Sequence, residues 1–393
     1  MFRILKQSTK SKARLGLLRT QHGVIHTPFF MPDATKAAVK SLSSDDLARL
    51  GLESMVVNTY HLYLQPGIEV IKKAPGVQAF MNWDKPLLSD SGGYQVFSLI
   101  HKNKNLGRIT DEKVTFQSPV DGSKHDLTPE KSIQIQFDLG VDMMVCLDDC
   151  PPNDASEAIM LGAIERTIAW AKRCKIEYDK QVKKRKIKNR PMLFGVIQGG
   201  TSLELRRQCA EALTAIGFNG YGFGARHVDE GGKFLAKPLS YTADLIPEDK
   251  LRFGLGIGAP RDIIRAVKMG WDMFDCVIPT REARHGKLYI WKMENRKWKI
   301  DKKKNPFSIF HLPFSRRQWH ETINITNAKF IKDFSPINPA SKLPELRAYT
   351  KAYLHHLFKT QEPLALRLAT LNNLEFYLDL MSNIQKAIKA GEL

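Results

Sequence analysis

Three aspartates of this chain stand directly after apolar runs, and they are its first candidates for chemistry. Asp90, Asp148 and Asp275 each follow such a run, and a fourth run ends in Gln198. In a parallel barrel the carboxyl ends of all strands meet on one rim, where the chemistry of that fold takes place. Carboxylates and an amide on one rim indicate a site for a polar, ring-shaped substrate, worked on by acid–base or nucleophilic chemistry.

Strand-like runs rich in Val, Ile, Leu and Phe alternate with helical patterns and must position these side chains. There are seven of them: residues 54–57, 85–89, 143–147, 193–197, 217–224, 251–258 and 271–274. The runs are continuously apolar, as expected for parallel strands that are covered on both faces. Regular strand–helix alternation over this length favours a (β/α)8 barrel, with an open doubly wound sheet as the alternative from pattern alone.

Capping signals place three helices between the runs. Ser156 precedes apolar residues at helical spacing and is expected to be an N-cap. Thr128 followed by a proline and a glutamate predicts a second helix start. Gly51 is expected to end a helix over residues 43–50.

The size and composition are those of a globular protein with a large core. The chain has 393 residues, of which 43% are hydrophobic, so one barrel with additions and two domains are both compatible with its length. The N-terminus has no long apolar stretch behind it, and no window approaches the length of a membrane span. We therefore expect a cytoplasmic protein that makes no contact with a membrane.

The charge balance favours a polyanionic partner. There are 60 Lys and Arg against 41 Asp and Glu, which gives a formal net charge of +19. Nucleic acid is the commonest partner of such a surface, and the alternative is that many of the lysines only keep the surface solvated. In residues 292–321, cationic side chains alternate with aromatic ones, a pattern that suits RNA contact and equally suits a surface loop whose aromatics dock on the barrel.

The cysteines argue against structural disulfides and against a thiolate metal site. Five are present, an odd number, and no Cys-x-x-Cys pair occurs. No cysteine follows Cys276, so the C-terminal part of the chain cannot hold zinc through thiolates.

Four longer motifs occur in a specific order: residues 58–62, 89–96, 195–200 and 272–281. This order resembles the tRNA-guanine transglycosylase family of bacterial type, and the resemblance covers nearly the whole chain. It implies a (β/α)8 barrel that takes part in queuosine modification of tRNA. Such enzymes exchange guanine at the anticodon wobble position for a free 7-deazaguanine base, either 7-aminomethyl-7-deazaguanine or queuine.

The chemistry of base exchange fits two carboxylates. An N-glycosidic bond is broken and remade at the same carbon, and retention there is simplest through a covalent enzyme–ribose intermediate. The resemblance assigns Asp275 as the nucleophile and Asp90 as the general acid/base. Without the resemblance, Asp90 would be interpreted as the cap of a glycine-rich turn and Asp275 as a helix cap.

The resemblance also assigns the residues that hold the base and the tRNA. Asp148 would accept two adjacent N–H donors of the purine edge, and Gln198 would contact the same edge. Tyr94 would stack on the base, with Leu255 in place of the usual methionine on the other face. The remaining assigned positions are Asn58, Ser91, Gly224 and Ala225 for the substrate and Arg281 and Arg284 for the anticodon loop.

This sequence departs from the family at the base pocket. Where the family carries Gly-Gly-Leu, the chain reads Gly224, Ala225 and Arg226, followed by His227. The alanine keeps its N–H, so the contact to the base persists if the backbone angles suit a Cβ. A guanidinium close to the pocket would disfavour an incoming base that carries an ammonium. The preferred interpretation is that Arg226 points out to a tRNA phosphate, and an altered incoming base is the alternative.

A second departure concerns zinc. The family has a Cys-x-Cys-x-x-Cys cluster and a later histidine, and the matching positions here are Ser341, Leu343, Leu346 and Asn372. All four ligands are missing, so we expect no zinc and no other cofactor. Structural zinc contributes roughly 10–16 kcal/mol of apparent binding energy to small folds, so packing of Leu343 and Leu346 would have to replace it.

These observations predict one barrel domain over residues 1–393. Residues 288–322 would be a basic, aromatic insertion that extends the tRNA contact, and residues 335–375 a zinc-type subdomain without its ligands. Tyr349, Tyr353 and His356 fall at the family's dimer contact, so the resemblance implies a homodimer.

The sequence supports three competing functions less well than the function of the family. A non-catalytic tRNA-binding paralogue is the main one, and the retention of Asp90 and Asp275 argues against it. Related enzymes that modify DNA or the D-arm of archaeal tRNA are the second. A barrel enzyme for small molecules is the third, and it leaves the positive charge unexplained.

Overall fold

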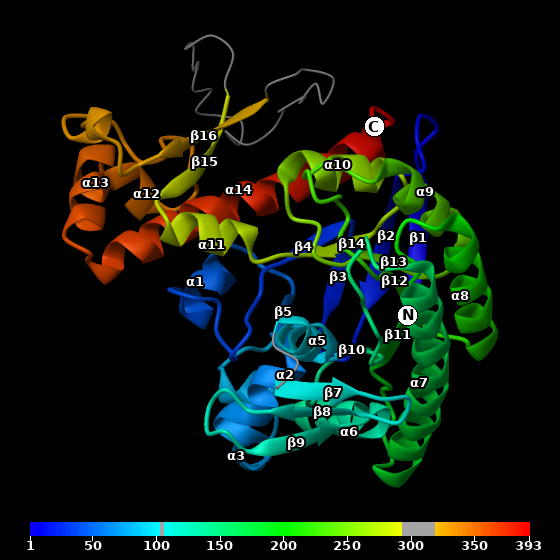
Figure 1. Cartoon of the computed structure of the whole chain (residues 1–393). Helices are drawn as coiled ribbons and strands as arrows, with labels where there is room; N and C mark the ends of the chain where they lie inside the picture. The colour runs from blue at the N-terminus through cyan, green and yellow to red at the C-terminus, as the bar shows by residue number, and fades with distance from the viewer. Residues whose placement is uncertain (103–105, 293–318) are drawn as a thin grey trace. The chain divides into compact units, whose positions relative to one another are not determined.

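The computed structural model describes residues 1–102, 106–292 and 319–393 (Figure 1). The chain forms two compact units. The barrel unit contains residues 1–7, 11–39 and 53–276, and the C-terminal unit contains residues 8–10, 40–52 and 277–393. Each unit has a buried apolar cluster of its own.

The barrel unit is built on an eight-stranded parallel sheet that closes on itself. The strands follow the order β4-β14-β13-β12-β11-β10-β6-β5. Asp33, just after β4, forms a parallel bridge to Val56 of β5, and the Ala34 N–H donates to the Val56 carbonyl at 2.7 Å. The strands are β4 (Phe29–Met31), β5 (Met55–Asn58), β6 (Leu87–Asp90), β10 (Met143–Val145), β11 (Met192–Ile197), β12 (Gly220–Phe223), β13 (Leu251–Gly254) and β14 (Met273–Asp275). The predicted (β/α)8 barrel is therefore confirmed, and the open sheet is excluded.

Each of the seven predicted runs contains one strand of the barrel. The eighth strand, β4, was not predicted, because Pro28 and Pro32 flank its three residues and interrupt the apolar run. Several predicted runs extend beyond the strands that they overlap. The run 251–258 forms a strand only as far as Gly254, since a loop that leads into the next helix begins at Leu255.

The barrel interior is filled by large apolar side chains from seven of its strands. The buried cluster includes Phe194 and Phe253, whose rings meet edge to face with centroids 6.3 Å apart. Leu18 and Ile25 join this cluster from a small antiparallel sheet of β1 (Phe2–Gln7), β2 (Arg14–Arg19) and β3 (Val24–Thr27). The strand that adds nothing to the cluster is β12, which is rich in glycine.

Helices surround the barrel and begin at the predicted caps. Thr128 accepts a hydrogen bond from the Lys131 N–H at 3.1 Å, and Ser156 accepts one from the Ile159 N–H at 3.4 Å, so both predicted helix starts are confirmed. The helices that follow barrel strands include α5 (Gly93–Lys102), α6 (Pro129–Leu139), α7 (Glu157–Lys184), α8 (Leu203–Ile216), α9 (Ala236–Leu245) and α10 (Pro260–Lys268). A three-stranded sheet of β7 (Gly107–Ile109), β8 (Val114–Gln117) and β9 (Lys124–Leu127) lies between α5 and α6 in sequence.

The C-terminal unit is mostly helical. Its elements are α1 (Ser44–Arg49), α11 (Ile278–Arg284), β15 (Lys287–Trp291), β16 (His320–Asn324), α12 (Pro344–Ala348), α13 (Lys351–Lys359) and α14 (Pro363–Ala390). Ser43 caps α1 and Gly51 follows it with a φ of 76°, as predicted. The predicted insertion begins and ends in the antiparallel pair β15 and β16, and residues 293–318 between them lie outside the described residues.

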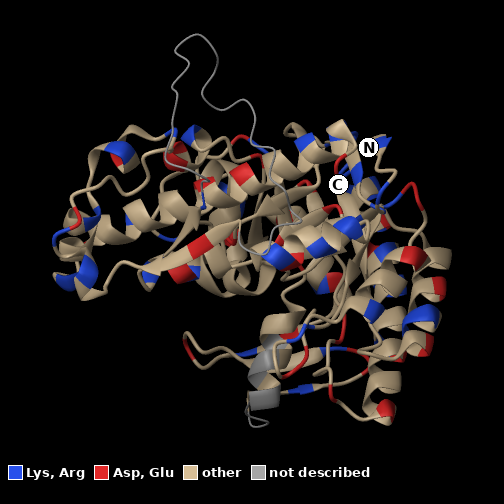
Figure 2. Cartoon of the chain, turned by 90° about the horizontal axis from the view of Figure 1, so that it is seen from above, with Lys and Arg blue, Asp and Glu red and all other residues tan. Residues whose placement is uncertain are grey.

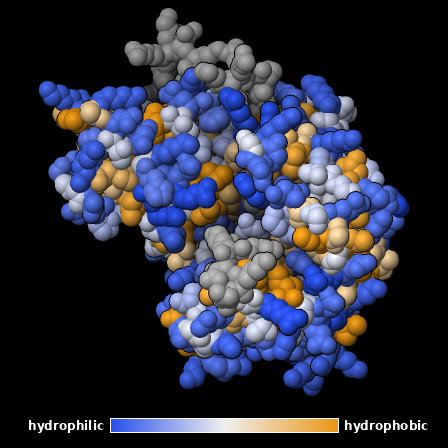
Figure 3. Space-filling view, viewed as in Figure 1, coloured by the Kyte–Doolittle hydropathy of each residue, from blue (hydrophilic) through white to orange (hydrophobic). Residues whose placement is uncertain are grey.

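Charged side chains of both signs are spread over the described part of the molecule. In Figure 2, Lys and Arg are interspersed with Asp and Glu along the helices of both units. The face shown in Figure 3 is mostly hydrophilic, with apolar residues in small groups. No helix in the described part of the chain combines the length and the apolar character that crossing a bilayer requires.

A buried ion pair holds the start of β14. Arg14 Nε and Nη2 donate to Asp272 Oδ1 and Oδ2 at 2.8 and 2.6 Å, and the Arg252 N–H donates to Oδ2 at 2.8 Å. The side chains of Arg14 and Asp272 are only 2% and 0% exposed. Because Asp272 immediately precedes the strand that ends in Asp275, this pair helps to fix where that carboxylate lies.

Replacing Asp272 with alanine should lower the free energy of unfolding by about 3–5 kcal/mol, because it leaves the guanidinium of Arg14 buried without its anion. Urea unfolding followed by circular dichroism measures this. Asp244→Ala is the control, since Asp244 pairs with Lys12 at 2.6 Å on the surface, where both side chains are about half exposed, and a loss of only about 0–1 kcal/mol is expected. Equal losses in the two variants would contradict the prediction.

Candidate active site

Asp90 lies at the end of β6, opposite Asn58 at the end of β5. Asn58 Nδ2 donates to Asp90 Oδ2 at 2.5 Å, and the N–H groups of Gly92 and Thr59 donate to Oδ1 at 3.0 and 3.3 Å. Burial raises the pKa of Asp90 to about 7 against the opposing effect of these donors, and the charge of Asp275 raises it further. Hydrogen bonds to both oxygens therefore fix the orientation of the carboxyl group. Its pKa lies near neutral pH, as that of a general acid/base should.

Asp275 ends β14, next to Met31 of β4. The N–H of Gly256 donates to Asp275 Oδ1 at 2.9 Å. Burial raises the pKa of Asp275 to about 6, and the N–H donor opposes that rise. Asp275 lies close enough to Asp90 for its charge to act on that carboxyl group, so the barrel brings the two predicted catalytic residues together.

Asp148 and Gln198 form a second polar pair on the rim. Gln198 directly follows β11, and its Nε2 donates to Asp148 Oδ2 at 2.6 Å. Burial raises the pKa of Asp148 to about 7, the Gln198 donor opposes the rise, and the charge of Asp149 adds to it. A buried carboxylate beside an amide offers acceptors and a donor to one edge of a heterocycle.

Glycines of β12 and the residue after it allow close approach on this side of the rim. A Cβ at Gly224 would lie 2.3 Å from Gln198 Nε2, and a Cβ at Gly222 would lie 2.7 Å from Leu255 Cδ1. The predicted pocket side chains of Gln198 and Leu255 therefore pack directly against the backbone of these glycines. Gly222 was not among the predicted site residues, although its signal was the alternation of glycines at 220, 222 and 224.

Tyr94 and Ser91 lie around the start of α5. The Tyr94 side chain is largely exposed, at 58%, which leaves a ring face free for stacking. Ser91 is buried, and its Oγ accepts a hydrogen bond from the Gly93 N–H at 3.2 Å. Ser91 thus has a clear local role in the turn, and its substrate contact stays a prediction.

Ala225 has a φ of 130°, a backbone conformation that favours glycine. The backbone angle at this position therefore does not suit a Cβ, and the residue is held in a strained conformation beside Gly224. Arg226 is exposed, which supports the interpretation that it points away from the pocket. His227 lies 3.6 Å from Asp262 Oδ2 of α10 and packs edge to face on Phe234, so it anchors the loop.

Arg281 and Arg284 lie three residues apart on α11 of the C-terminal unit. Arg281 is exposed, and burial together with the charge of Arg281 lowers the pKa of Arg284. Within the described ranges neither arginine forms an ion pair. Two neighbouring cations without carboxylate partners are suited to phosphate oxygens.

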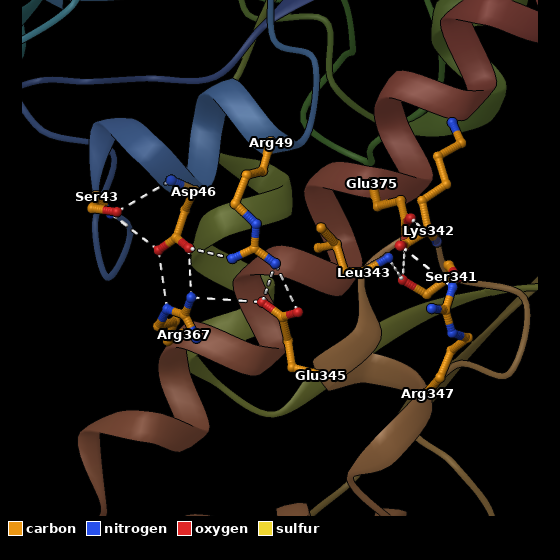
Figure 4. A network of polar contacts seen from close by, with 10 residues as sticks. All are labelled: Ser43, Asp46, Arg49, Ser341, Lys342, Leu343, Glu345, Arg347, Arg367 and Glu375. Atoms are coloured by element: carbon orange, nitrogen blue, oxygen red, sulfur yellow. Dashed lines mark hydrogen bonds and ion pairs between the residues drawn. The ribbon is translucent and has the colours of Figure 1, made fainter.

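The positions that match the family's zinc ligands hold a different arrangement, shown in Figure 4. Ser341 Oγ donates to Glu375 Oε2 at 2.5 Å, the Lys342 N–H donates to Oε1 at 2.6 Å, and the Leu343 N–H donates to Ser341 Oγ at 3.0 Å. Asn372 Nδ2 donates to the Tyr289 carbonyl at 3.1 Å. The serine hydroxyl and the Asn372 amide are thus engaged within the protein.

These residues do not fit zinc. Leu343 and Leu346 have no donor atom and lie in the apolar core of the C-terminal unit, as expected from the sequence. No group of three His, Cys, Asp or Glu in the described parts of the chain is placed to hold a metal ion.

A second polar cluster in Figure 4 ties α1 to the other helices of the C-terminal unit. Arg367 of α14 donates to both oxygens of Asp46 at 2.5 and 3.0 Å. Arg49 donates to both oxygens of Glu345 at 2.8 and 2.9 Å. The Arg367–Asp46 pair is bidentate through two nitrogens and therefore directional, whereas Arg49 uses Nη2 for both oxygens of Glu345.

Comparison with known proteins identifies the family. The family model described as queuine tRNA-ribosyltransferase matches residues 8–393. The chain belongs to this family. Relatives named queuine tRNA-ribosyltransferase include those of Caldanaerobacter subterraneus and Halothermothrix orenii, which are 42% and 41% identical over all of this chain and 94% of their own length. That of Shouchella clausii is 41% identical over 98% of this chain and 91% of its own length.

Family membership confirms the resemblance that the motifs predicted, while the structure adds groups that the motifs missed. Gly256 donates to the predicted nucleophile from a φ of 69°, which a Gly-Leu-Gly-Ile-Gly stretch could have signalled. Arg206 of α8 donates to the Gly224 carbonyl at 3.0 Å. Nothing in the sequence around this arginine distinguishes it from Arg207.

The raised pKa of Asp90 makes a prediction about stability. A carboxyl group that titrates near pH 7 when folded and near 3.9 when unfolded binds more protons in the folded state between these values. Its stabilising contribution is complete below about pH 4 and is lost as the pH rises through about 7. Between pH 5 and pH 8, the group should therefore lower the free energy of unfolding by about 2 kcal/mol.

Asp90→Asn should lack this part of the pH dependence. Urea unfolding of wild type and variant at pH 5, 6, 7 and 8 measures the difference between their curves. Asp84→Asn is the control, because Asp84 is exposed and lies near the start of the same segment. Curves of Asp90→Asn that run parallel to wild type over this range would refute the prediction.

Proposed function

We propose that this protein exchanges guanine at the wobble position of tRNA for a free 7-deazaguanine base, in queuosine modification. Family membership over residues 8–393 supports this function. The observation that carries the mechanism is the pairing of two buried carboxyl groups, Asp90 and Asp275, at the ends of two barrel strands and within reach of each other's charge.

Asp275 acts as the nucleophile. With a pKa of about 6 it is ionised at neutral pH, and the Gly256 N–H leaves the second oxygen available for attack. An Asp275 oxygen bonds to C1′ of the ribose as the bond to guanine breaks and the electron pair leaves with the base. Asp90, which titrates near pH 7, gives the departing base a proton.

The second displacement reverses these roles. Asp90 takes a proton from the incoming base, whose nitrogen then attacks C1′ and releases the Asp275 carboxylate. Retention of configuration follows from two inversions at one carbon. The three donors around Asp90 keep its carboxyl group in one orientation through both steps.

The base is held by the second polar pair. Asp148 accepts the two adjacent N–H groups of the purine edge, and Gln198, hydrogen-bonded to it, contacts the same edge. Tyr94 stacks on one face of the ring and Leu255 packs on the other. The N–H of Ala225 is directed to an acceptor of the base. With Arg226 exposed, either 7-aminomethyl-7-deazaguanine or queuine is compatible as the incoming base.

The tRNA is steadied by cations and by a second subunit. Arg281 and Arg284 hold phosphates of the anticodon loop, and the basic residues in 293–318 extend that contact. Tyr349 and Tyr353 are each more than a third exposed and stack with centroids 5.2 Å apart, a surface suited to a homodimer contact. The enzyme works in the cytoplasm, where its tRNA substrate is found.

Asp275→Asn should abolish the covalent enzyme–tRNA adduct, because an amide oxygen is a poor nucleophile. The adduct is measured as a mass or gel shift after incubation with tRNA that carries guanine at the wobble position. Asp90→Asn should slow release of labelled guanine by about 10²–10⁴-fold, since it lacks the acid. Asp244→Asn, on the surface, should match wild type. Adduct formation by Asp275→Asn would eliminate the mechanism, and the non-catalytic paralogue predicts no adduct from wild type either.

We further propose that the C-terminal unit folds without zinc and that Glu375 takes over the role of the missing metal. Its buried carboxylate accepts hydrogen bonds from Ser341 and Lys342, so one side chain of α14 joins the segment where thiolates would meet in the family. The packing of Leu343 and Leu346 supplies the rest of the stabilisation.

Purified protein should therefore contain far less than one zinc per chain, and a chelator should leave its melting temperature unchanged. Glu375→Ala should cost roughly 1.5–3 kcal/mol, because it leaves the buried hydroxyl of Ser341 without its acceptor. Asp379→Ala, one turn further along α14, removes only an ion pair with Lys342 and should cost about 0–1 kcal/mol. A metal content near one zinc per chain would overturn the proposal.

A further inference from the structure

Arg206 of α8 is a fully buried cation, with an exposed fraction of 0%. Arginine is almost never fully buried unless an anion pairs with it. In the part of the chain that the structure describes, Arg206 forms no ion pair, and its hydrogen-bond partners are backbone carbonyls. A buried charge that is neutralised by no carboxylate calls for a specific reason to be there.

The guanidinium joins the ends of two barrel strands. Nε donates to the Gly200 carbonyl at 2.8 Å, Nη1 to the Ile197 carbonyl at 3.2 Å and Nη2 to the Gly224 carbonyl at 3.0 Å. The first two carbonyls enclose Gln198 in sequence. The third belongs to the residue that precedes Ala225.

The guanidinium group of Arg206 also lies over an aromatic ring. The guanidinium carbon lies 3.8 Å from the centroid of the Phe223 ring, within the range of a cation–π contact. Burial lowers the pKa of Arg206 to about 9, so the group still carries its proton at neutral pH. The fork of donors is therefore charged and fixed in direction, which a lysine in the same place would not be.

The contact to Gly224 sets the direction of one peptide group. The Gly224–Ala225 peptide is trans, so its N–H points opposite to its carbonyl. Since Arg206 holds the carbonyl, the Ala225 N–H points away from Arg206. Among the described residues that N–H donates to no protein group. The φ of 130° at Ala225 shows that this orientation is kept against local backbone preference.

We propose that Arg206 is a positioning residue of the base pocket, which holds the Gly224–Ala225 peptide so that its N–H meets a carbonyl oxygen of the base. This inference rests on the proposed function. It explains how an alanine is retained at a position that favours glycine. It also ties the peptide that reads the base to the backbone on either side of Gln198, so both recognition groups are set by one side chain.

The test compares two bases in Arg206→Lys. Guanine carries the carbonyl acceptor, and 2-aminopurine lacks it together with the neighbouring N1–H while keeping the amino group, so the readout is how the difference between the bases changes from wild type to variant. Both are measured as competitors of labelled-guanine exchange into tRNA. In wild type guanine should bind more tightly than 2-aminopurine. In Arg206→Lys guanine should lose about tenfold in affinity while 2-aminopurine changes little, because only guanine uses the peptide N–H.

Discrimination between the two bases is the decisive readout, since a loss of folded enzyme lowers the rate with both bases and leaves their ratio unchanged. Arg207→Lys is the matched control, because Arg207 is the next residue of α8 and pairs on the surface with Glu204 and Glu211. Phe223→Leu removes the ring from the guanidinium and should reduce discrimination in the same direction. It serves as the test if Arg206→Lys does not fold.

The two proposals fail in different ways. If wild type forms no covalent adduct with tRNA, the proposed function fails. If wild type forms the adduct and a folded Arg206→Lys or Phe223→Leu discriminates between the bases as wild type does, the role of Arg206 is refuted and the function stands.

Discussion

The site depends on keeping two carboxyl groups buried near each other while each retains a few N–H donors. Burial raises the pKa values of Asp90 and Asp275 towards neutrality, and the donors from Asn58, Gly92 and Gly256 keep both groups within the range where they can be ionised. Only a closed barrel supplies this environment, because it collects strand ends from distant parts of the chain on one rim. Both carboxyl groups therefore titrate closer to neutral pH than an exposed aspartate does.

The barrel unit also buries two arginines, Arg14 and Arg206. Arg14 is matched by the carboxylate of Asp272 at the start of β14, so its charge is compensated and its role is to fix a strand. Among the described residues, the guanidinium of Arg206 contacts backbone carbonyl groups and the Phe223 ring, and no carboxylate. Its hydrogen bonds orient the backbone. Arg14 acts at the start of β14 and Arg206 at the rim, through the carbonyls that it holds, and neither is a candidate for contact with the substrate.

In the C-terminal unit, apolar packing and hydrogen bonds occupy the positions that match the family's zinc ligands. A metal fixes four ligands through strong, directional bonds. Here one carboxylate, Glu375, accepts from a hydroxyl and a backbone N–H, and two leucines fill apolar space. The bidentate pair of Asp46 with Arg367 supplies directionality elsewhere in the same unit, and Arg49 adds an ion pair with Glu345. In both arrangements the buried polar groups named here have hydrogen-bond partners.

The sequence by itself determined seven of the strands, three helix starts or ends and the family, and it favoured the barrel over an open sheet, because apolar runs, capping residues and motif order are local patterns. It did not reveal β4, whose three residues carry no periodicity, or the strain at Ala225, which depends on a backbone angle. Only the tertiary structure decided the pKa values of the three aspartates and the roles of Gly256, Arg206 and Glu375. These depend on burial and on donors from remote segments, and neither quantity exists until the chain has closed on itself.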